Sequence, residues 1–423
     1  MGRGRAPGRE TRLSAVPAPS VLPHSPSPWA PLRRPLFRNL WLATVLSNVG
    51  TWMHEVGAGW LMVTLDPSPL MVSLVQASTV LPIFFLSLPA GTLADMFDRR
   101  AYLIAMQVWM LLAAALLATI TLLGVVGPWS LLALTFALAA GAAMMTPAWA
   151  ASVPELVPPE ELPPAIALNS MGVNIARAIG PALAGVLVAA SGPAIAFVVN
   201  AVSFVGVIVV LVRWRRPRRE GERRRERFVE AIGSGLRYVK QARQLQRVMA
   251  RSLGFFVFAT ATWSLLPLVA ASTGGDSRVY GVMLGAIGAG AVAAALFMPR
   301  VRSALSRDAL VRIGTLIYAA AMLVMAIADT LFALIPAMLL TGAAWLAIVS
   351  TLHVSAQTAV ASWVRARALS VYLVAYAIGM TAGSVLWGAV AAWAGIHTAL
   401  AIAGFGALLG MAATWRVSVE AAR

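Results

Sequence analysis

Two charged side chains lie inside long apolar stretches of the chain, where ionisable groups are costly and usually functional. Glu55 lies within the apolar stretch 38–64, and Arg177 lies within the stretch 165–190. Poor solvation favours the neutral form of a carboxylate, whereas a nearby arginine favours its charged form. A carboxylate that alternates between these two settings can take up and release a proton. Glu55 is therefore the candidate for coupling a process to a proton gradient.

The role of Arg177 has two readings. Helical rise places it within about two turns of the depth of Glu55, so the two side chains could pair. Alternatively, Arg177 is a structural charge whose hydrogen bonds are satisfied by carbonyl groups of its own or neighbouring helices. His54 precedes Glu55 but points about 100° away from it on a helix, which predicts that His54 packs against other side chains.

Uncharged polar and aromatic side chains in the apolar stretches are further candidates for lining a substrate cavity. The ones that we group with Arg177 are Asn48, Trp52, Gln76, Asn174 and Tyr376. Each of these residue types also serves as an interhelical hydrogen-bonding or packing residue, so both interpretations remain open.

The composition indicates a membrane protein. The chain has 423 residues, of which 60% are hydrophobic and 12% charged, whereas soluble proteins are about 45–50% apolar and about 25% charged. The net charge of +17 could suggest nucleic acid, but nucleic-acid-binding proteins are not this hydrophobic. There are no cysteines, which excludes disulfides, thiolate nucleophiles and cysteine-ligated metals. We expect no metal and no cofactor.

Twelve stretches are long enough to cross a bilayer as helices, which takes about 20 apolar residues. They are 38–64, 70–93, 101–123, 129–151, 165–190, 194–213, 252–271, 279–298, 310–328, 331–352, 367–392 and 397–415. The basic connection 214–250 divides them six and six. The predicted fold is therefore an all-α membrane protein with twelve transmembrane helices in two six-helix bundles.

The basic residues predict the orientation of these spans. Lysine and arginine gather on the cytoplasmic side of membrane proteins. With both termini inside, all the basic residues except Arg177 and Arg278 fall on the cytoplasmic side. We therefore predict a multi-pass protein of the bacterial inner membrane with both termini in the cytoplasm.

The predicted organisation has four parts. Residues 1–36 are rich in proline and arginine and lack the apolar core of a signal peptide, so we expect a disordered cytoplasmic tail. Within the linker, Phe228, Ile232, Leu236 and Val239 recur at helical spacing, which predicts an amphipathic helix on the membrane surface. The parts are the tail 1–36, the first bundle 37–213, the basic linker 214–250 and the second bundle 251–423.

The two halves resemble each other at an offset of 203 residues. Glycines mark this correspondence, and the matching pairs are Gly180 with Gly383, Gly185 with Gly388, and Gly192 with Gly395. Such parallel repeats predict two bundles related by an axis along the membrane normal.

A signature follows the second stretch. Gly91-Thr-Leu-Ala-Asp95-Met-Phe-Asp98-Arg99-Arg100 resembles the pattern G-x-L-A-D-x-x-G-R-R/K of the major facilitator superfamily, with Asp98 in place of the second glycine. In such a motif the glycine permits close helix approach, the aspartate faces the N-terminal end of a neighbouring helix and the arginines hold the loop in the cytosol. The resemblance implies a secondary transporter that gates access at this loop.

A second segment is similar to a group of bacterial exporters that includes the enterobactin exporter. It runs from Pro154-Glu-Leu-Val-Pro158 through Ala165-Ile-Ala-Leu-Asn-Ser170 to Arg177-Ala-Ile-Gly180-Pro181. Gly180, Pro181 and Gly185 also resemble the fifth-helix motif of drug/proton antiporters. In physical terms, small residues here let another helix pack closely and the proline bends the helix. The resemblance favours export over simple helix packing.

These observations lead to one expected function and two alternatives. We expect a monomeric secondary transporter that exports a small amphipathic or hydrophobic molecule in exchange for protons, with the lipid bilayer as its only other partner. A uniporter or importer of a small nutrient is the first alternative, although the spans offer few sugar- or ion-coordinating groups. A membrane-embedded enzyme or a non-transporting scaffold is the second, and the scattered histidines and carboxylates disfavour an enzyme.

Overall fold

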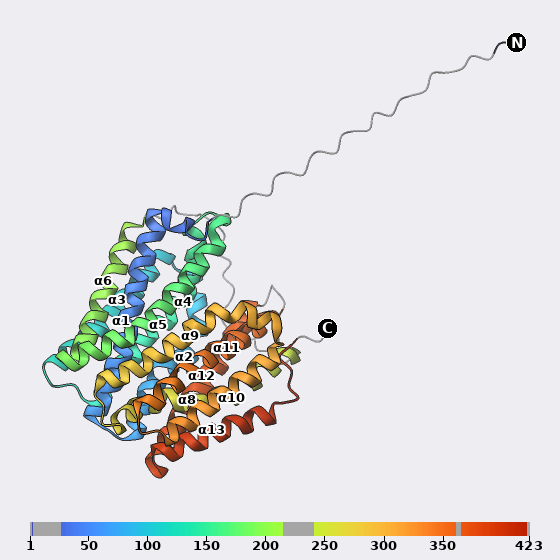
Figure 1. Cartoon of the computed structure of the whole chain (residues 1–423). Helices are drawn as coiled ribbons and strands as arrows, with labels where there is room; N and C mark the ends of the chain where they lie inside the picture. Colours follow the sequence, from blue (N-terminus) through green and yellow to red (C-terminus); the bar gives the residue numbers. More distant parts are fainter. Residues whose placement is uncertain (1, 3–26, 215–240, 361–364, 421–423) are drawn as a thin grey trace.

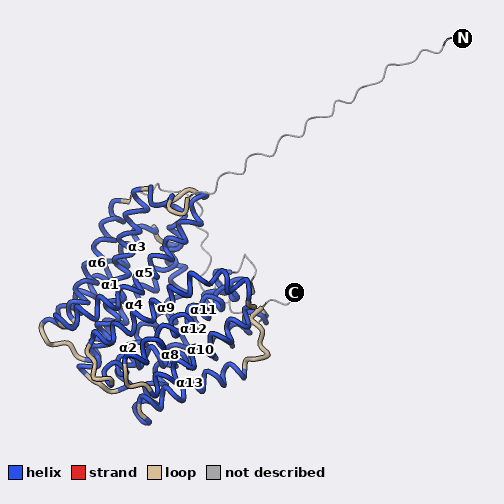
Figure 2. The backbone as a smooth tube through the Cα atoms, in the orientation of Figure 1, coloured by secondary structure: helices blue, strands red, loops and turns tan. Residues whose placement is uncertain are grey.

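Long helices account for nearly all of the described part of the chain in the computed structural model. The structure describes residue 2 and residues 27–214, 241–360 and 365–420, and within these ranges it contains helices and loops but no strand (Figure 2). The first half of the chain contributes η1 (Ala30–Arg33), α1 (Pro35–Leu65), α2 (Pro69–Met96), α3 (Arg99–Leu122), α4 (Pro128–Leu156), η2 (Pro159–Glu161), α5 (Leu162–Ser191) and α6 (Ala194–Arg213). The second half contributes α8 (Arg243–Ser272), α9 (Ser277–Ala304), α10 (Arg307–Ile327), α11 (Leu331–Thr358), α12 (Arg365–Ala394) and α13 (Ile396–Ala413).

The helix boundaries follow local sequence signals. Proline begins α1, α2 and α4, a position where its missing N–H costs no hydrogen bond. Side-chain caps begin other helices: Asp98 accepts a hydrogen bond of 2.9 Å from the backbone N–H of Ala101, and Ser306 accepts one of 3.1 Å from that of Ala309. Such caps satisfy backbone donors that have no partner inside the helix.

Eleven of the described helices are long and apolar enough to span a membrane. The exception is α1, although it is 31 residues long. Its polar residues Asn48, His54 and Glu55 lower its hydropathy, and α1 packs between α5 and α6. The prediction of twelve spans therefore matches twelve long helices among the described residues, but the composition of α1 alone does not identify it as a span.

The two halves of the protein diverge at the end of the molecule where both chain termini lie, and they converge at the opposite end (Figure 1). We call the end where both chain termini lie, with the junctions at 97–98, 157–161 and 305–306, the terminal end. The opposite end, with the junctions at 66–68, 123–127, 192–193, 273–276, 328–330 and 395, is the distal end. Close contacts between the halves join α2 to α12 and α5 to α9.

The repeat found in the sequence is present in the packing. A Cβ on Gly185 of α5 would lie 2.8 Å from the carbonyl oxygen of Ser277 in α9, and one on Gly388 of α12 would lie 2.7 Å from the Ser73 side chain in α2. The third pair, Gly192 and Gly395, has positive φ values of 79° and 87° at matching helix junctions. The two halves are thus pseudo-symmetric bundles, as the spacing of glycines predicts.

Two parts of the predicted organisation differ from the structure or fall outside it. Residues 27–36, which we expected to be disordered, form η1 and the start of α1, and Arg34 pairs with Glu161 at 2.8 Å. The remainder of the predicted tail and the proposed amphipathic helix at 228–239 lie outside the described residues.

Candidate functional site

A cavity of about 360 Å³ lies within the N-terminal half, the bundle of α1–α6. Helices α1, α2, α3, α4 and α6 supply most of its lining, and α12 contributes Ser370 and Leu373 from the C-terminal half, the bundle of α8–α13. The polar lining residues are Thr51, His54, Glu55, Thr79, Ser87, Thr135, Thr146, Asn200 and Ser370. The apolar ones are Ile83, Met110, Leu138, Ala139, Ala142, Ala143, Pro147, Phe204 and Leu373. Its volume falls in the range of small-molecule sites, about 300–1,000 Å³.

Glu55 is the only formally charged residue among the described residues that line this cavity. Its neighbour His54 lines the cavity as well, in addition to packing against the ring of Phe197 with centroids 5.1 Å apart. The predicted packing of His54 is therefore present, and the residue lines the cavity in addition. Residues of both α4 and α6 line the cavity together with these two consecutive residues of α1.

Several buried polar atoms that belong to the lining have no hydrogen-bond partner among the described residues. They are both ring nitrogens of His54, the hydroxyl oxygens of Ser87 and Thr135, and the side-chain oxygen of Asn200. His54, Thr135 and Asn200 are each at most 4% exposed. Buried polar groups are normally hydrogen-bonded, so a cluster of unpartnered ones around a cavity is suited to a ligand or to water.

Glycines of α1 set the geometry of this cluster. A Cβ on Gly50 would lie 3.0 Å from the Cα and 3.1 Å from the side-chain oxygen of Asn200, and one on Gly57 would lie 2.9 Å from the Cβ of Ala196. Because α1 carries glycine at both positions, α6 approaches closely enough to bring Asn200 beside the turn that precedes His54.

Glu55 also lies near the contact between the two halves. It is close enough to Tyr280 of α9 to interact with it electrostatically. One helical turn after Glu55, a Cβ on Gly59 would lie 2.9 Å from the Tyr280 hydroxyl. Tyr280 is 5% exposed, so its hydroxyl is held against α1 at the distal side of Glu55.

Arg177 lies outside the cavity lining and does not pair with Glu55 within 4 Å. Its guanidinium lies over the ring of Trp52, 5.5 Å from the centroid, and its Nε atom has no partner. Tyr376 of α12 interacts with Arg177 electrostatically and packs edge-on against Phe256, with centroids 4.8 Å apart. Arg177, Trp52 and Tyr376 therefore form a separate cluster between the two halves.

The three remaining cavity candidates do not line this cavity either. The amide of Asn174 donates to the carbonyl of Ser170 within its own helix, at 2.8 Å. Asn48 and Gln76 are half-buried on α1 and α2. Their role in substrate binding stays a prediction.

The arginines of the loop motif connect three helices at the terminal end. Arg99 forms an ion pair of 2.8 Å with Glu155 of α4 and donates to the carbonyl of Ala151 at 3.2 Å. Arg100 donates to the carbonyls of Leu211, at 2.8 Å, and of Val212 in α6. The motif therefore fastens α3 to α4 and α6.

Gly91 and Asp95 belong to the same loop motif. No described atom lies within 4 Å of a Cβ built on Gly91, and the close helix approach expected at this glycine stays a prediction. The side chain of Asp95 lies outside the described residues, and its proposed contact with the start of α12 stays a prediction.

The fifth-helix motif packs on two sides. A Cβ on Gly180 would lie 2.7 Å from the Cβ of Trp52 in α1, and one on Gly185 would lie 3.0 Å from the Cα of Gly281 in α9. The carbonyl of Pro181 faces Gly281 as well, at 2.6 Å from a Cβ there. The close helix packing expected from the small residues is confirmed. At Gly180, α5 packs against α1 of its own bundle, and at Gly185 it packs against α9 of the other bundle.

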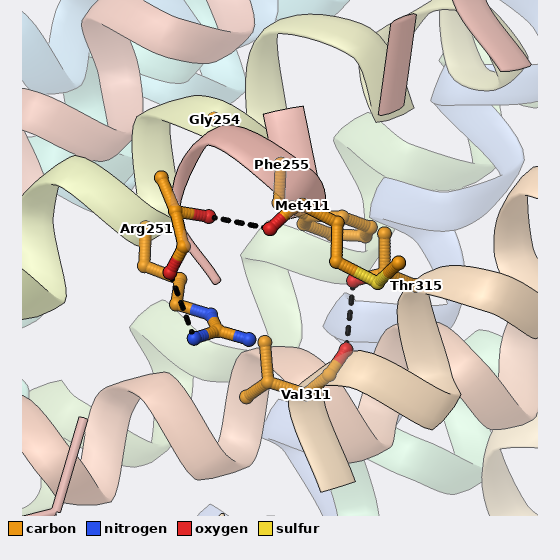
Figure 3. Close-up of a pocket in the computed structure, with 7 residues that line it drawn as sticks. Arg251, Gly254, Phe255, Val311, Thr315 and Met411 are labelled. Carbon is orange, nitrogen blue, oxygen red and sulfur yellow. Dashed lines mark hydrogen bonds between the residues drawn. The ribbon is translucent and has the colours of Figure 1, made fainter. Parts of the chain in front are cut away.

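A buried arginine that the sequence did not single out anchors the C-terminus. Arg251 of α8 is 2% exposed and contacts Asp308 at 3.4 Å and the carbonyl of Val417 at 2.9 Å. Figure 3 shows it beside a small cavity that Val311, Thr315 and Met411 also line. With a volume of about 10 Å³, this space is too small for an organic ligand, so Arg251 has a structural role. Helical periodicity could have included it, because α8 begins at Arg243, well before the predicted span 252–271.

Metal chemistry has no candidate site in the part of the chain that the structure describes. No group of three or more His, Cys, Asp or Glu side chains there could hold a metal ion.

Comparison with known proteins gives the family. Residues 26–423 match the family described as transmembrane secretion effector. The chain is 26% identical to an uncharacterized MFS-type transporter, YfiS, of Bacillus subtilis over 64% of this chain and 67% of that one. It is 25% identical to the staphyloferrin A transporter of Staphylococcus aureus over 61% and 66%, and 27% identical to the multidrug efflux pump Tap of Mycobacterium tuberculosis over 56% and 57%. The matched regions thus span about two thirds or less of these relatives.

Solved structures with the same fold are transporters too. The nucleoside transporter NupG superposes with a TM-score of 0.72 at 13% identity, covering 90% of this chain and 99% of that one. A bacterial homologue of ferroportin in an inward-facing state gives 0.67 at 14% identity, covering 90% and 98%. At this identity the likeness establishes the fold. Together with the family match, it shows that the chain is a membrane transporter of the major facilitator superfamily and belongs to its transmembrane secretion effector family.

Proposed function

We propose that this transporter exports a small amphipathic or hydrophobic molecule from the cytoplasm in exchange for protons. The observation that carries the proposal is the position of Glu55. It is the one formally charged side chain among the described cavity-lining residues, and it lies one turn from the contact of Gly59 with Tyr280 of the other half.

A carboxylate in this position can link protonation to the movement of the halves. No described basic side chain pairs with it, so its charged form depends on solvent or a ligand that reaches the cavity. When the halves rearrange, the Tyr280 hydroxyl and the access of water to Glu55 change together. A difference in the stability of the two protonation states between the two arrangements is what coupling requires.

The direction and the type of substrate rest on the cavity and on the relatives. Much of the cavity wall is apolar, which suits an amphipathic or hydrophobic molecule more than a sugar or an ion. The relatives include a multidrug efflux pump and a siderophore transporter, which favours export. Arginine at the junctions of the terminal end supports a cytoplasmic location for that end, which is the end where the halves diverge (Figure 1). The bacterial inner membrane, cytoplasmic termini and a monomeric state complete the proposal.

Transport by a Glu55→Gln variant tests the proposal. Everted membrane vesicles that contain the wild type should accumulate a lipophilic fluorescent dye when a pH gradient is imposed. In the Glu55→Gln variant, gradient-driven accumulation should be lost while downhill exchange of the dye persists. Glu160→Gln is the control, because Glu160 is exposed at the terminal end. If the Glu55→Gln variant still accumulates dye against its gradient, Glu55 is not the coupling residue and the proposal fails.

A further inference from the structure

The lining of the cavity is more polar than an apolar drug pocket needs. His54, Thr135 and Asn200 line it from α1, α4 and α6, and each is buried with polar side-chain atoms that lack a hydrogen-bond partner among the described residues. We call these three residues, with Glu55, the polar recess. Leaving a buried polar atom unpaired costs about 1–3 kcal/mol, so a recess that keeps several such atoms is built to pair them with something that enters.

The chemistry of the recess selects what can enter. Glu55 and the side-chain oxygen of Asn200 accept hydrogen bonds, Thr135 can accept or donate, and a neutral imidazole such as His54 offers one acceptor and one donor. Neither lysine nor arginine is present among the described residues that line the cavity. A group that is rich in donors and positively charged therefore fits, whereas an anion would face acceptors and a carboxylate.

The remainder of the cavity fits a flat apolar body. Helix α4 lines the cavity with Leu138, Ala139, Ala142 and Ala143, and its three alanines leave room along the wall. The C-terminal half contributes Ser370 and Leu373 of α12. A molecule with its head at the recess would therefore also meet apolar side chains of α4 and α12.

We propose that the polar recess binds the protonated amine of an amphipathic organic amine, with Asn200, Thr135 and His54 as specificity-determining residues. This inference rests on the proposed export function and names its substrate class. The ligand is held mainly by the N-terminal half, so its head group need not leave that half when α12 moves. Asn200 is held in place because Gly50 allows α6 to approach α1.

Fluorescence titration of the purified full-length protein in lipid nanodiscs tests the recess directly. The probe is dansylcadaverine, which joins an aromatic body to a primary amine, and its N-acetyl derivative is the uncharged counterpart. A hydrogen bond to a charged group contributes enough that the amine should bind at least about tenfold more tightly than the amide. Thr135→Val and Asn200→Ala should each weaken binding of the amine about tenfold or less while changing binding of the amide little.

A matched variant controls for changes in packing. Thr341 is a buried threonine of α11, outside the cavity, whose hydroxyl bonds only within its own helix, to Ala337 at 2.8 Å. Thr341→Val should bind the amine as the wild type does. Thr135→Val keeps the shape of the side chain, so it tests the recess even where Asn200→Ala lowers folding yield.

The outcomes separate this inference from the proposed function. Equal affinity of the wild type for the amine and the amide would overturn the proposed recess. It would also be overturned if Thr135→Val and Asn200→Ala bound the amine as tightly as Thr341→Val does. In either case a loss of coupling in Glu55→Gln would leave proton-coupled export standing. Selective loss of amine binding in the recess variants, together with intact coupling in Glu55→Gln, would support the recess and reject the coupling role of Glu55.

Discussion

Arg99 and Glu155 form an ion pair of 2.8 Å that joins the start of α3 to the end of α4. The two residues belong to two separate segments of the sequence, the loop motif and the Pro154–Pro158 segment. Arg99 also reaches the carbonyl of Ala151. The two motifs therefore contribute to one set of contacts, which holds α3 and α4 together at the terminal end of the N-terminal half.

The first prediction concerns the contribution of the ion pair between Arg99 and Glu155 to stability. Both side chains are partly exposed, 29% for Arg99 and 21% for Glu155, so each single variant, Arg99→Gln and Glu155→Gln, should destabilise the protein only modestly. In a double-mutant cycle, the coupling energy should be about 0.2–1 kcal/mol, as for other partly exposed pairs. Thermal unfolding in detergent measures it. A coupling energy of zero would mean that the pair does not contribute to stability.

Much of the fold follows from the sequence because apolar length and capping are local properties. The predicted stretch 194–213 coincides with α6, and the stretch 70–93 differs from α2 by no more than three residues at either end. The offset of 203 residues also predicts the packing of Gly185 and Gly388. Spacing does not reveal which distant side chain a charged residue meets, so the partner of Arg99 emerged only from the structure.

The second prediction concerns the backbone contact between α5 and α9. A Cβ on Gly281 would lie 2.6 Å from the carbonyl oxygen of Pro181 and 2.7 Å from the Cα of Gly185. Backbone atoms cannot move aside as a flexible side chain can, so Gly281→Ala should force the two helices apart and destabilise the protein by about 1–3 kcal/mol.

Spin labels on α5 and α9 would measure this separation. The chain has no cysteine, so cysteines placed at the exposed residues Val186 and Val282 can be labelled selectively. Gly281→Ala should shift their distance distribution to longer values. Gly206→Ala is the control, because no described atom lies within 4 Å of a Cβ there. An unchanged distribution in Gly281→Ala would contradict the close contact.

The candidate site was only partly predictable. Glu55 stood out because it is a rare acid in an apolar stretch, and its place in the cavity lining agrees with that signal. Thr135 did not stand out in the sequence, because a single threonine in an apolar helix has many ordinary roles. The cavity draws on six helices, and no sequence spacing records which faces of separate helices meet. The low hydropathy of α1 is a further sign in the sequence that this helix contributes polar side chains to the interior.

The third prediction concerns orientation. A reporter that is active only in the periplasm should give a signal when fused after Gly127 or Ser191, at the distal end, and none when fused after Arg100, at the terminal end. The basic residues at the terminal end are the physical reason, because they are retained on the cytoplasmic side. A cytoplasmic reporter should give the opposite pattern at each site. Signals reversed at all three positions would invert the proposed direction of transport.

The last prediction distinguishes a structural Arg177 from one that binds substrate. Its guanidinium lies over Trp52, and no described carboxylate lies within ion-pair distance. A cation–π contact contributes about 0.5–2 kcal/mol, depending on solvation. We therefore expect Arg177→Met and Trp52→Leu to be non-additive in thermal unfolding, with a coupling energy in this range.

Arg177→Met should also keep most of the wild-type export of the dye, because Arg177 lies outside the described cavity lining. Methionine has a long, flexible side chain and removes a half-buried charge that has no described carboxylate partner. Arg177→Lys is the informative control, because it retains the charge but lacks the planar group that stacks on the indole. If Arg177 is structural, Arg177→Lys should be no more stable than Arg177→Met. The opposite result would be additive effects of Arg177→Met and Trp52→Leu on the free energy of unfolding, with export lost in Arg177→Met but kept in Arg177→Lys. Arg177 would then lie in the substrate path, where its charge is required and its contact with Trp52 is not.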